Sequence, residues 1–293
     1  MTTPIFRGTC TALVTPFSDR GIDFIALDRL LEDQLATGVE ALVIGGTTGE
    51  AATLEHEELL ALIAHCVRAC QGKTKLIAGI GGNYTKRAAE NARAAAALGA
   101  DAMLCVTPYY NRCTQDGLLA HYEAIAEATE LPILLYNVPA RTNVKISPET
   151  CAKLAELPTV AGIKEADPDV GRVLALHRSC GEDFPIYCGC DDRILAFMAC
   201  GAVGAVSVLS NLRPGEVKAL VDAALRGEYT RALGLQRQLQ PLILALSEAV
   251  NPIPIKAALA LAGMDCGPCR LPLTGAEENL TEKLQKLISG STV

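Results

Sequence analysis

Residues 41–72, ALVIGGTTGEAATLEHEELLALIAHCVRACQG, contain one complete unit of the pattern that decides the fold. The short aliphatic run at 41–45 predicts a strand, and its lack of polar alternation is typical of strands covered on both faces. The stretch 53–70 predicts a helix, which ends before Gly72. A buried strand followed by a helix is the repeating unit of a parallel sheet.

The same unit recurs along the whole chain. Helix signals lie between the aliphatic runs: Thr85 precedes an alanine-rich stretch, Ser147 can cap a helix that starts at Pro148, and Asp191 or Asp192 can cap another. We expect eight strands, at residues 10–15, 41–45, 76–79, 102–106, 133–136, 160–163, 185–187 and 205–208.

Eight strand–helix units predict an α/β protein of the (β/α)8 TIM-barrel type. We expect the barrel, with the active site, over residues 1–227, and a helical extension packed on it over 228–293. The extension has helix-like stretches at 228–250, 255–261 and 274–288. A doubly wound open sheet is the rival fold, but no Gly-x-Gly-x-x-Gly follows the first strand.

The composition argues against several classes of protein. Of the 293 residues 50% are hydrophobic and 20% charged, so the chain is too apolar to be disordered. A net charge of −7 without a basic run argues against nucleic-acid binding. No run approaches ~18 apolar residues, and the N-terminus lacks an apolar leader. We therefore expect a cytoplasmic protein with no membrane partner.

The 12 cysteines are expected to be mostly buried thiols in a reduced interior. Two pairs stand out: Cys188 with Cys190, and the stretch Cys266-Gly267-Pro268-Cys269, which has the letters of a dithiol redox motif. That motif needs a helix start to activate its thiol, and the nearby Pro272 argues against one. A zinc site would need both pairs to converge, so we expect no metal.

Active sites of barrels lie at the carboxyl ends of the strands, and Lys164 follows the sixth expected strand. Burial among apolar side chains lowers a lysine's pKa by up to ~3–5 units, and a neutral amine attacks carbonyl carbon to give a Schiff base. The alternative interpretation is that Lys164 pairs with Glu165 or another carboxylate at the rim.

Other strand ends carry groups that suit the same chemistry. Tyr109, Tyr110 and Tyr136 offer phenols that can relay protons. For Tyr109 and Tyr110 the alternative is an aromatic contact at a subunit interface. The Gly-rich loop 45–49 offers amides and two hydroxyls to a carboxylate, or is simply a tight turn. Arg141 can bind a second carboxylate, or form a surface ion pair. Together they predict a Schiff-base lyase acting on a small keto acid.

At these residues the chain resembles the dihydrodipicolinate synthase family, within the superfamily of Schiff-base pyruvate aldolases and N-acetylneuraminate lyases. The resemblance covers essentially the whole chain, and Arg141-Thr142 after Tyr-Asn-Val-Pro-Ala points to this family rather than to sialic-acid lyases. The motifs that carry it are GGTTGE at 45–50, VTPYYNR at 106–112, YNVPART at 136–142, GIKE at 162–165 and NPIPIK at 251–256.

The resemblance implies a condensation of pyruvate with L-aspartate-4-semialdehyde to 4-hydroxy-tetrahydrodipicolinate, the first committed step of the diaminopimelate and lysine pathway. Lys164 would form the Schiff base, and Tyr136 would donate and accept protons. Thr47 would connect Tyr136 with Tyr110 of a neighbouring subunit in a homotetramer, a dimer of dimers. No cofactor and no metal are implied.

The resemblance also implies how the substrates are bound. Thr48, together with Thr47, would hold the pyruvate carboxylate, and Arg141 would hold the carboxylate of the semialdehyde. Gly189 and Val206 match positions that line the pyruvate pocket. The chain departs from the family beside this pocket, where Gly-Asp-Asp is replaced by Gly189-Cys190-Asp191.

A second departure concerns the family's site for feedback inhibition by lysine. His56, Asn83 and Tyr109 match it, but Leu59 replaces a histidine and Arg87 replaces a glutamate. A guanidinium in place of a carboxylate repels the ammonium groups of lysine. We therefore expect weak or absent inhibition by lysine.

Two alternatives remain open at this point. Another class I aldolase of the superfamily, acting on a sialic acid or a 2-keto-3-deoxy sugar acid, would not need Arg141 as a carboxylate clamp. A non-catalytic barrel that serves as a thiol sensor or interaction module is supported only by the Cys266–Cys269 stretch.

Overall fold

Eight parallel strands close into a barrel in the computed structural model, which describes residues 3–290. The strands are hydrogen-bonded in the order β1-β10-β9-β8-β7-β6-β5-β4, and β1 also pairs with β4. The TIM-barrel prediction is thus confirmed. The bounds are β1 Gly8–Ala12, β4 Ala41–Ile44, β5 Lys75–Gly79, β6 Ala102–Val106, β7 Ile133–Asn137, β8 Val160–Glu165, β9 Ile186–Cys188 and β10 Gly204–Ser207.

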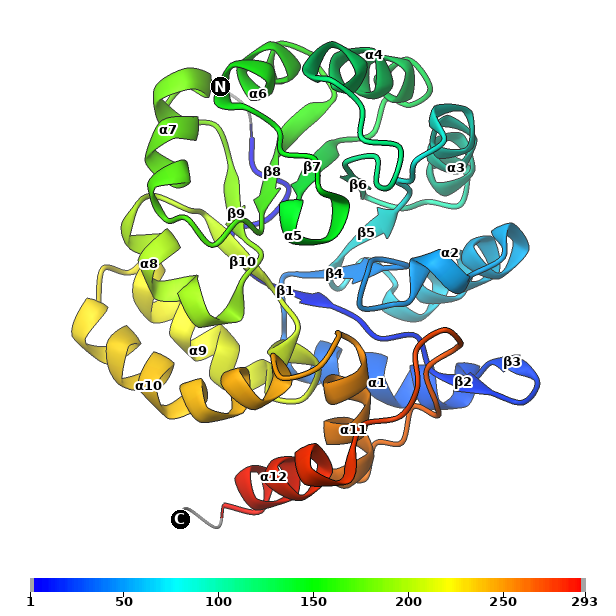
Figure 1. Ribbon diagram of the computed structural model, residues 1–293, viewed down its shortest axis with the longest axis vertical. Helices are drawn as coiled ribbons and strands as arrows, with labels where there is room; N and C mark the ends of the chain where they lie inside the picture. The colour runs from blue at the N-terminus through cyan, green and yellow to red at the C-terminus, as the bar shows by residue number, and fades with distance from the viewer. Residues whose placement is uncertain (1–2, 291–293) are drawn as a thin grey trace.

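Helices surround the strands in a ring, as Figure 1 shows. The sequence signals did not place α1, α4, α5, α7 or α9 individually, and they missed the small hairpin of β2 (Phe17–Ser18) with β3 (Gly21–Ile22). The helices of the ring are α1 Phe24–Thr37, α2 His56–Cys70, α3 Thr85–Ala97, α4 Gln115–Ala126, α6 Pro148–Ala155, α7 Gly171–Cys180, α8 Ile194–Ala199 and α9 Pro214–Leu225. The short helix α5, Pro139–Thr142, lies inside the ring next to β7 (Figure 1).

Three further helices follow the ring: α10 (Tyr229–Leu246), α11 (Ile253–Leu261) and α12 (Glu278–Ile288). α10 and α12 are shorter than the sequence suggested, whereas α11 begins two residues earlier than expected. In Figure 1 they lie along one side of the barrel, and the chain between α11 and α12 rises beside the β2–β3 hairpin. A domain boundary between 227 and 228 stays a prediction. Within residues 3–290 no helix is long and apolar enough to cross a membrane.

Of the predicted helix caps, the one at Ser147 is confirmed and the one at Asp191 or Asp192 is wrong. Ser147 caps α6, because its hydroxyl accepts a hydrogen bond from the Thr150 amide at 3.1 Å. The assignment of Asp191 or Asp192 as a helix cap is wrong, since neither the short turn Asp191–Arg193 nor α8 has a side-chain cap. The Asp191 carboxylate instead accepts from the amides of Val208 and Leu209, and so connects the ends of β9 and β10.

The barrel interior is filled by apolar side chains that the strands point inward, among them Cys10, Leu104 and Val206. The amino-terminal end is closed by Phe6 and Tyr187, whose rings stack with centroids 4.3 Å apart. The Tyr187 hydroxyl donates to the Phe6 carbonyl at 2.9 Å, so a hydrogen bond as well as ring stacking joins the two residues.

Candidate active site

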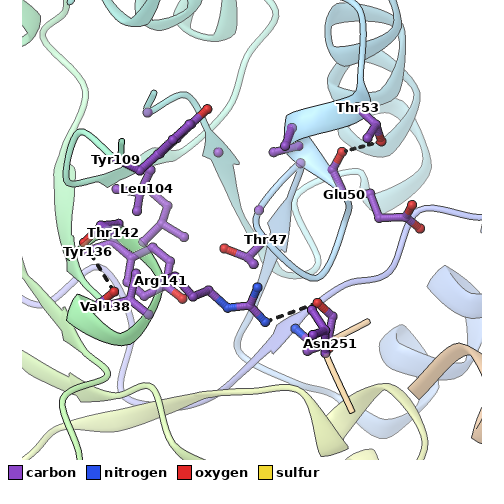
Figure 2. Close-up of a pocket in the computed structure, with 18 of the residues that line it drawn as sticks. Thr47, Glu50, Thr53, Leu104, Tyr109, Tyr136, Val138, Arg141, Thr142 and Asn251 are labelled. Atoms are coloured by element: carbon purple, nitrogen blue, oxygen red, sulfur yellow. Dashed lines mark hydrogen bonds between the residues drawn. The ribbon is translucent and has the colours of Figure 1, made fainter. Parts of the chain in front are cut away.

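A cavity of about 320 Å³ opens at the carboxyl ends of the strands, as expected for a barrel enzyme. Figure 2 shows Thr47, Tyr109, Tyr136 and Arg141 around this space. Its wall comes from the loops after β4 and β5, from β6 and β7, from α5, and from the extension, which contributes Val250, Asn251, Pro272 and Leu273.

Lys164 lies inside the barrel, within β8 rather than after it. It is 5% exposed and does not itself line the cavity. The pairing of β7 with β8 places it opposite Tyr136, and its Nζ lies 4.2 Å from the centre of the Tyr136 ring. The predicted nucleophile and the predicted proton donor are therefore neighbours, and Tyr136 is itself part of the cavity wall.

The next residues on both strands face outward, because side chains alternate along a strand. There Glu165, fully buried, accepts from Asn137 Nδ2 at 2.7 Å and from Arg172 Nε at 3.0 Å. Burial raises the pKa of Glu165 above its ordinary value, and the Arg172 guanidinium opposes this rise. The interpretation that Lys164 pairs with Glu165 is wrong, since Arg172 occupies that carboxylate.

The glycine-rich loop after β4 comes into backbone contact with the end of β5. Gly45 has a positive φ of 64°, and a Cβ on Gly79 would overlap the Gly45 carbonyl. This close approach lets Thr47 line the cavity while Thr48 is buried behind it. The Thr48 hydroxyl accepts a hydrogen bond from Asn251 Nδ2 at 3.0 Å.

Arg141 is exposed on the short helix α5, and Figure 2 shows it reaching across the cavity. Its Nη2 donates to the Asn251 carbonyl at 3.2 Å. Asn251 thus contacts both predicted carboxylate-binding groups, and its Oδ1 is a buried acceptor without a partner. Sequence reasoning missed this residue as part of the site: the motif 251–256 was recognisable, but its position depends on how the extension folds back.

Of the remaining predicted site residues, one lines the cavity, two lie inside the barrel or against Lys164, and one does not reach the cavity. Gly189 lies against Lys164, because a Cβ there would be 3.1 Å from the lysine Cε. Val206 is inside the barrel on β10, and Tyr109 lines the cavity. Tyr110 is 91% exposed and has a left-handed backbone with φ of 73°. It does not reach this chain's own cavity.

A separate cavity of about 480 Å³ contains the predicted lysine-site residues His56, Asn83 and Tyr109. Leu59 and Arg87, the two departures, line it as well. His56 Nδ1 lies 3.0 Å from the Asn91 side-chain oxygen. Tyr109 belongs to the walls of both cavities.

All 12 cysteines are free thiols. Burial raises the pKa of Cys190 and Cys266 to about 12 and that of Cys269 to about 11, which disfavours the reactive thiolate. Among residues 3–290 there is no cluster of three or more His, Cys, Asp or Glu side chains that could hold a metal ion.

Comparison with known proteins places these residues in a family. The model of the dihydrodipicolinate synthetase family matches residues 5–291. A 4-hydroxy-tetrahydrodipicolinate synthase of Exiguobacterium sibiricum is 48% identical over 275 residues, 94% of each chain. The solved dihydrodipicolinate synthase of Aquifex aeolicus gives a TM-score of 0.96 at 39% identity, covering 98% of both chains. The chloride-inhibited enzyme from Acinetobacter baumannii, solved with pyruvate, gives 0.94 at 41% identity over 97% of this chain and 98% of the other.

The contacts of Glu165 generate a pH-dependent prediction. Replacing Arg172 with Met leaves a buried carboxylate unpaired, and we expect a loss of about 3–5 kcal/mol of unfolding free energy at pH 8. The raised pKa means that the folded state holds the Glu165 proton more tightly than the unfolded chain does. Stability from this group is therefore greatest at low pH and is lost as pH rises through the raised pKa.

The deficit of Arg172→Met should accordingly shrink towards pH 5, where Glu165 can be buried as the neutral acid. Urea unfolding followed by circular dichroism at both pH values measures it. Arg178→Met, on the exposed face of the same helix, is the matched control and should leave the unfolding free energy nearly unchanged. Equal losses of unfolding free energy at pH 5 and pH 8 would contradict the conclusion that Arg172 compensates the charge of Glu165.

Proposed function

This chain belongs to the dihydrodipicolinate synthetase family, and from that premise we propose that it condenses pyruvate with L-aspartate-4-semialdehyde. The product is 4-hydroxy-tetrahydrodipicolinate, and the enzyme is a lyase of diaminopimelate and lysine synthesis. One observation carries the proposal: a lysine enclosed by the barrel wall, with a tyrosine ring against its Nζ, next to a cavity at the carboxyl end of the strands.

The Lys164 amine attacks the C2 carbonyl of pyruvate, and the carbinolamine loses water to give the Schiff base. Loss of a methyl proton then gives an enamine, whose carbon attacks the aldehyde of the semialdehyde. Tyr136 is the group placed to move these protons, because its ring contacts the lysine Nζ while its side chain lines the cavity. The amino group that came from the semialdehyde then attacks the imine carbon and displaces the Lys164 amine. This step closes the heterocyclic ring and releases the product.

Anion binding follows from the loop after β4. Thr47 and Thr48 offer hydroxyls and backbone amides to the pyruvate carboxylate. Gly189 lies against the lysine and has no side chain, which leaves room for the small methyl ketone, and Val206 adds to the apolar interior of the barrel. The site needs no metal or organic cofactor for these steps, because the imine itself withdraws the electrons.

The second substrate is an amino acid, and two groups at the cavity suit its ends. Arg141 offers a planar fork to the carboxylate. The unpartnered Asn251 Oδ1 offers an acceptor to the ammonium group. An aldolase for sialic or 2-keto-3-deoxy sugar acids is the alternative, and it has less use for this arrangement.

We infer a homotetramer in which Tyr110 serves a neighbouring active site. The support is the position of Tyr110: a large aromatic side chain, 91% exposed, held outward by a left-handed backbone beside the mouth of the cavity. An exposed aromatic of this kind is typical of an interface. Thr47 would link it to Tyr136.

We also infer that lysine inhibits the enzyme weakly or not at all. The cavity that contains His56 and Asn83 has the Arg87 guanidinium at its wall, and Leu59 replaces a polar side chain there. Arg87 is partly neutralised by Glu90, with Nε 3.4 Å from the carboxylate. The positive charge of Arg87 that Glu90 does not neutralise still disfavours binding of a cationic amino acid.

The first test is trapping of the Schiff base. Incubation with pyruvate and borohydride should add a three-carbon unit to Lys164, found by peptide mass, and Lys164→Arg should stay unmodified. Turnover with aspartate semialdehyde against sialic and 2-keto-3-deoxy sugar acids then identifies the substrate. An unmodified Lys164 in the folded protein would refute the mechanism, and turnover of a sugar acid alone would favour the alternative.

The second test concerns Tyr110. Tyr110→Phe removes the hydroxyl but keeps the ring, so we expect kcat to fall about ten- to a hundredfold, while sedimentation still shows the tetramer. Tyr84→Phe, at another exposed tyrosine, should leave kcat unchanged. A monomer with full activity, or an unchanged kcat in Tyr110→Phe, would contradict the shared site.

The third test concerns lysine. Millimolar lysine should change the steady-state rate little, and the double variant Leu59→His/Arg87→Glu should gain inhibition because it restores a polar, anionic wall. Arg93→Glu makes the same charge change at an exposed position of α3 and should gain none. A micromolar inhibition constant in the unmodified protein would defeat the inference.

A further inference from the structure

The stretch that contains Cys266-Gly267-Pro268-Cys269 has no role in the proposed reaction as a dithiol, yet it lies at the active site. Residues 266–273, here called the strap, connect α11 towards α12 without forming a helix. Two strap residues, Pro272 and Leu273, line the catalytic cavity. In Figure 1 the chain between α11 and α12 rises from the extension to the β2–β3 hairpin.

The strap is fastened first at Phe17 on that hairpin. The Phe17 amide donates to the Cys266 carbonyl at 3.0 Å. Gly267 has φ of 67°, and a Cβ there would overlap the Phe17 carbonyl oxygen, so glycine is required. On the Phe17 ring, Arg270 Cζ lies 4.0 Å and Lys256 Nζ 4.5 Å from the centroid, both within cation–π range.

Glu50, the last residue of the GGTTGE motif, is the second fastening. Its Oε1 lies 2.6 Å from Lys256 Nζ, and its Oε2 accepts from the Arg270 amide at 2.8 Å. Lys256 Nζ also donates to the Pro268 carbonyl at 3.1 Å. The side chains of the pair are 1% and 4% exposed, so one buried carboxylate holds both α11 and the strap.

The third fastening joins the strap to the start of α2. The Arg270 guanidinium donates to both Glu58 oxygens, at 2.6 and 2.5 Å, and to the Thr53 carbonyl at 2.9 Å. Glu58 also accepts from the Glu55 amide, and so closes the capping box of α2. The chain that follows the two threonines is thus held at Glu50, at Thr53 and at Glu58.

A buried ion pair of this kind adds little to stability compared with apolar side chains of the same volume, because both charges lose their hydration. Its effect is geometric. The Glu50 amide donates to the Thr47 carbonyl at 3.1 Å, and Glu50 itself has a left-handed backbone with φ of 57°. Fixing its carboxylate therefore fixes the orientation of the turn from which Thr47 and Thr48 project. Figure 2 shows the Glu50 side chain directed away from Tyr136 and Arg141.

We propose that Glu50 is a positioning residue for substrate binding, which aligns the Thr47-Thr48 turn and, through Lys256 and Arg270, holds the strap as a fixed wall of the cavity. The inference rests on the proposed function, since it assigns the turn to pyruvate. It accounts for the Cys266–Cys269 stretch as a structural element whose glycine, not its thiols, is essential.

Glu50→Gln, Lys256→Met and the double variant test the proposal. Each single variant should raise the KM for pyruvate about tenfold or more, because misplacement of a binding group by a fraction of an ångström weakens binding. The kcat should fall as well, because the same turn carries Thr47, the proposed link between Tyr136 and Tyr110. The double variant should be no worse than the poorer single, because both residues serve one contact. Lys283→Met is the control: its lysine pairs with Glu248 on the exposed surface of the extension, and its KM should be unchanged.

Unchanged KM values with a lower melting temperature would show that the pair is only structural, and multiplying effects in the double variant would show two independent roles; either result overturns the proposal. If a single variant does not fold, the double variant, which leaves no unpaired buried charge, replaces it, and Leu273→Ala tests the strap wall by the same KM measurement. Borohydride labelling of Lys164 by pyruvate is run on every sample. Absence of labelling in the unmodified protein refutes the proposed function itself, whereas labelling with unaltered KM in the variants refutes only the role of Glu50.

Discussion

The pairing of β7 with β8 is the constraint on which the rest of the site depends. Its register sets Tyr136 beside Lys164 inside the barrel and Asn137 beside Glu165 outside it. Neither pair can be moved alone, because a slip of one residue would send the lysine towards the helices and the carboxylate into the barrel. Arg172, from α7, binds Glu165 in the outer layer and so holds the inner pair in register from behind. Lys164, the proposed nucleophile, is therefore positioned by paired strands rather than by a loop.

The binding groups are held in a different way, by parts of the chain that are far apart in sequence. Thr48 and Asn251 are hydrogen-bonded although 203 residues separate them. Arg141 reaches the same Asn251 from the opposite side of the cavity. The helical extension is thus a wall of the site as well as a cover for the barrel. With Thr48 and Arg141 as the proposed binding groups, folding of the C-terminal helices is coupled to substrate affinity, whereas the position of Lys164 depends on the barrel alone.

Sequence reasoning reached the barrel and the lysine because both leave local signals. Eight aliphatic runs of strand length reveal the sheet, and Lys164 is conspicuous as a charge that ends such a run. What it missed depends on long-range contacts. Asn251 is an ordinary polar residue until the extension folds back, and Asp191 could be taken for a helix cap because its partners, the Val208 and Leu209 amides, come from the next strand end. The boundary of β8 was also misplaced by two residues, since a lysine and a glutamate do not resemble strand interior unless each has a buried partner.

Closure of the amino-terminal end of the barrel explains why the residues proposed to bind and select substrates lie at the carboxyl-terminal end. Phe6 and Tyr187 fill the bottom with a stacked, hydrogen-bonded pair, and aliphatic side chains fill the middle. The space that remains lies above Lys164, where the loops and the extension form the walls. The departures at Arg87, which lines the separate cavity, and at Cys190, which follows β9, leave untouched the strand pairing that places the lysine. Under the proposed mechanism, the imine chemistry can thus be kept while the second substrate and the response to effectors vary, because the fold separates the proposed nucleophile from the residues proposed to select what reaches it.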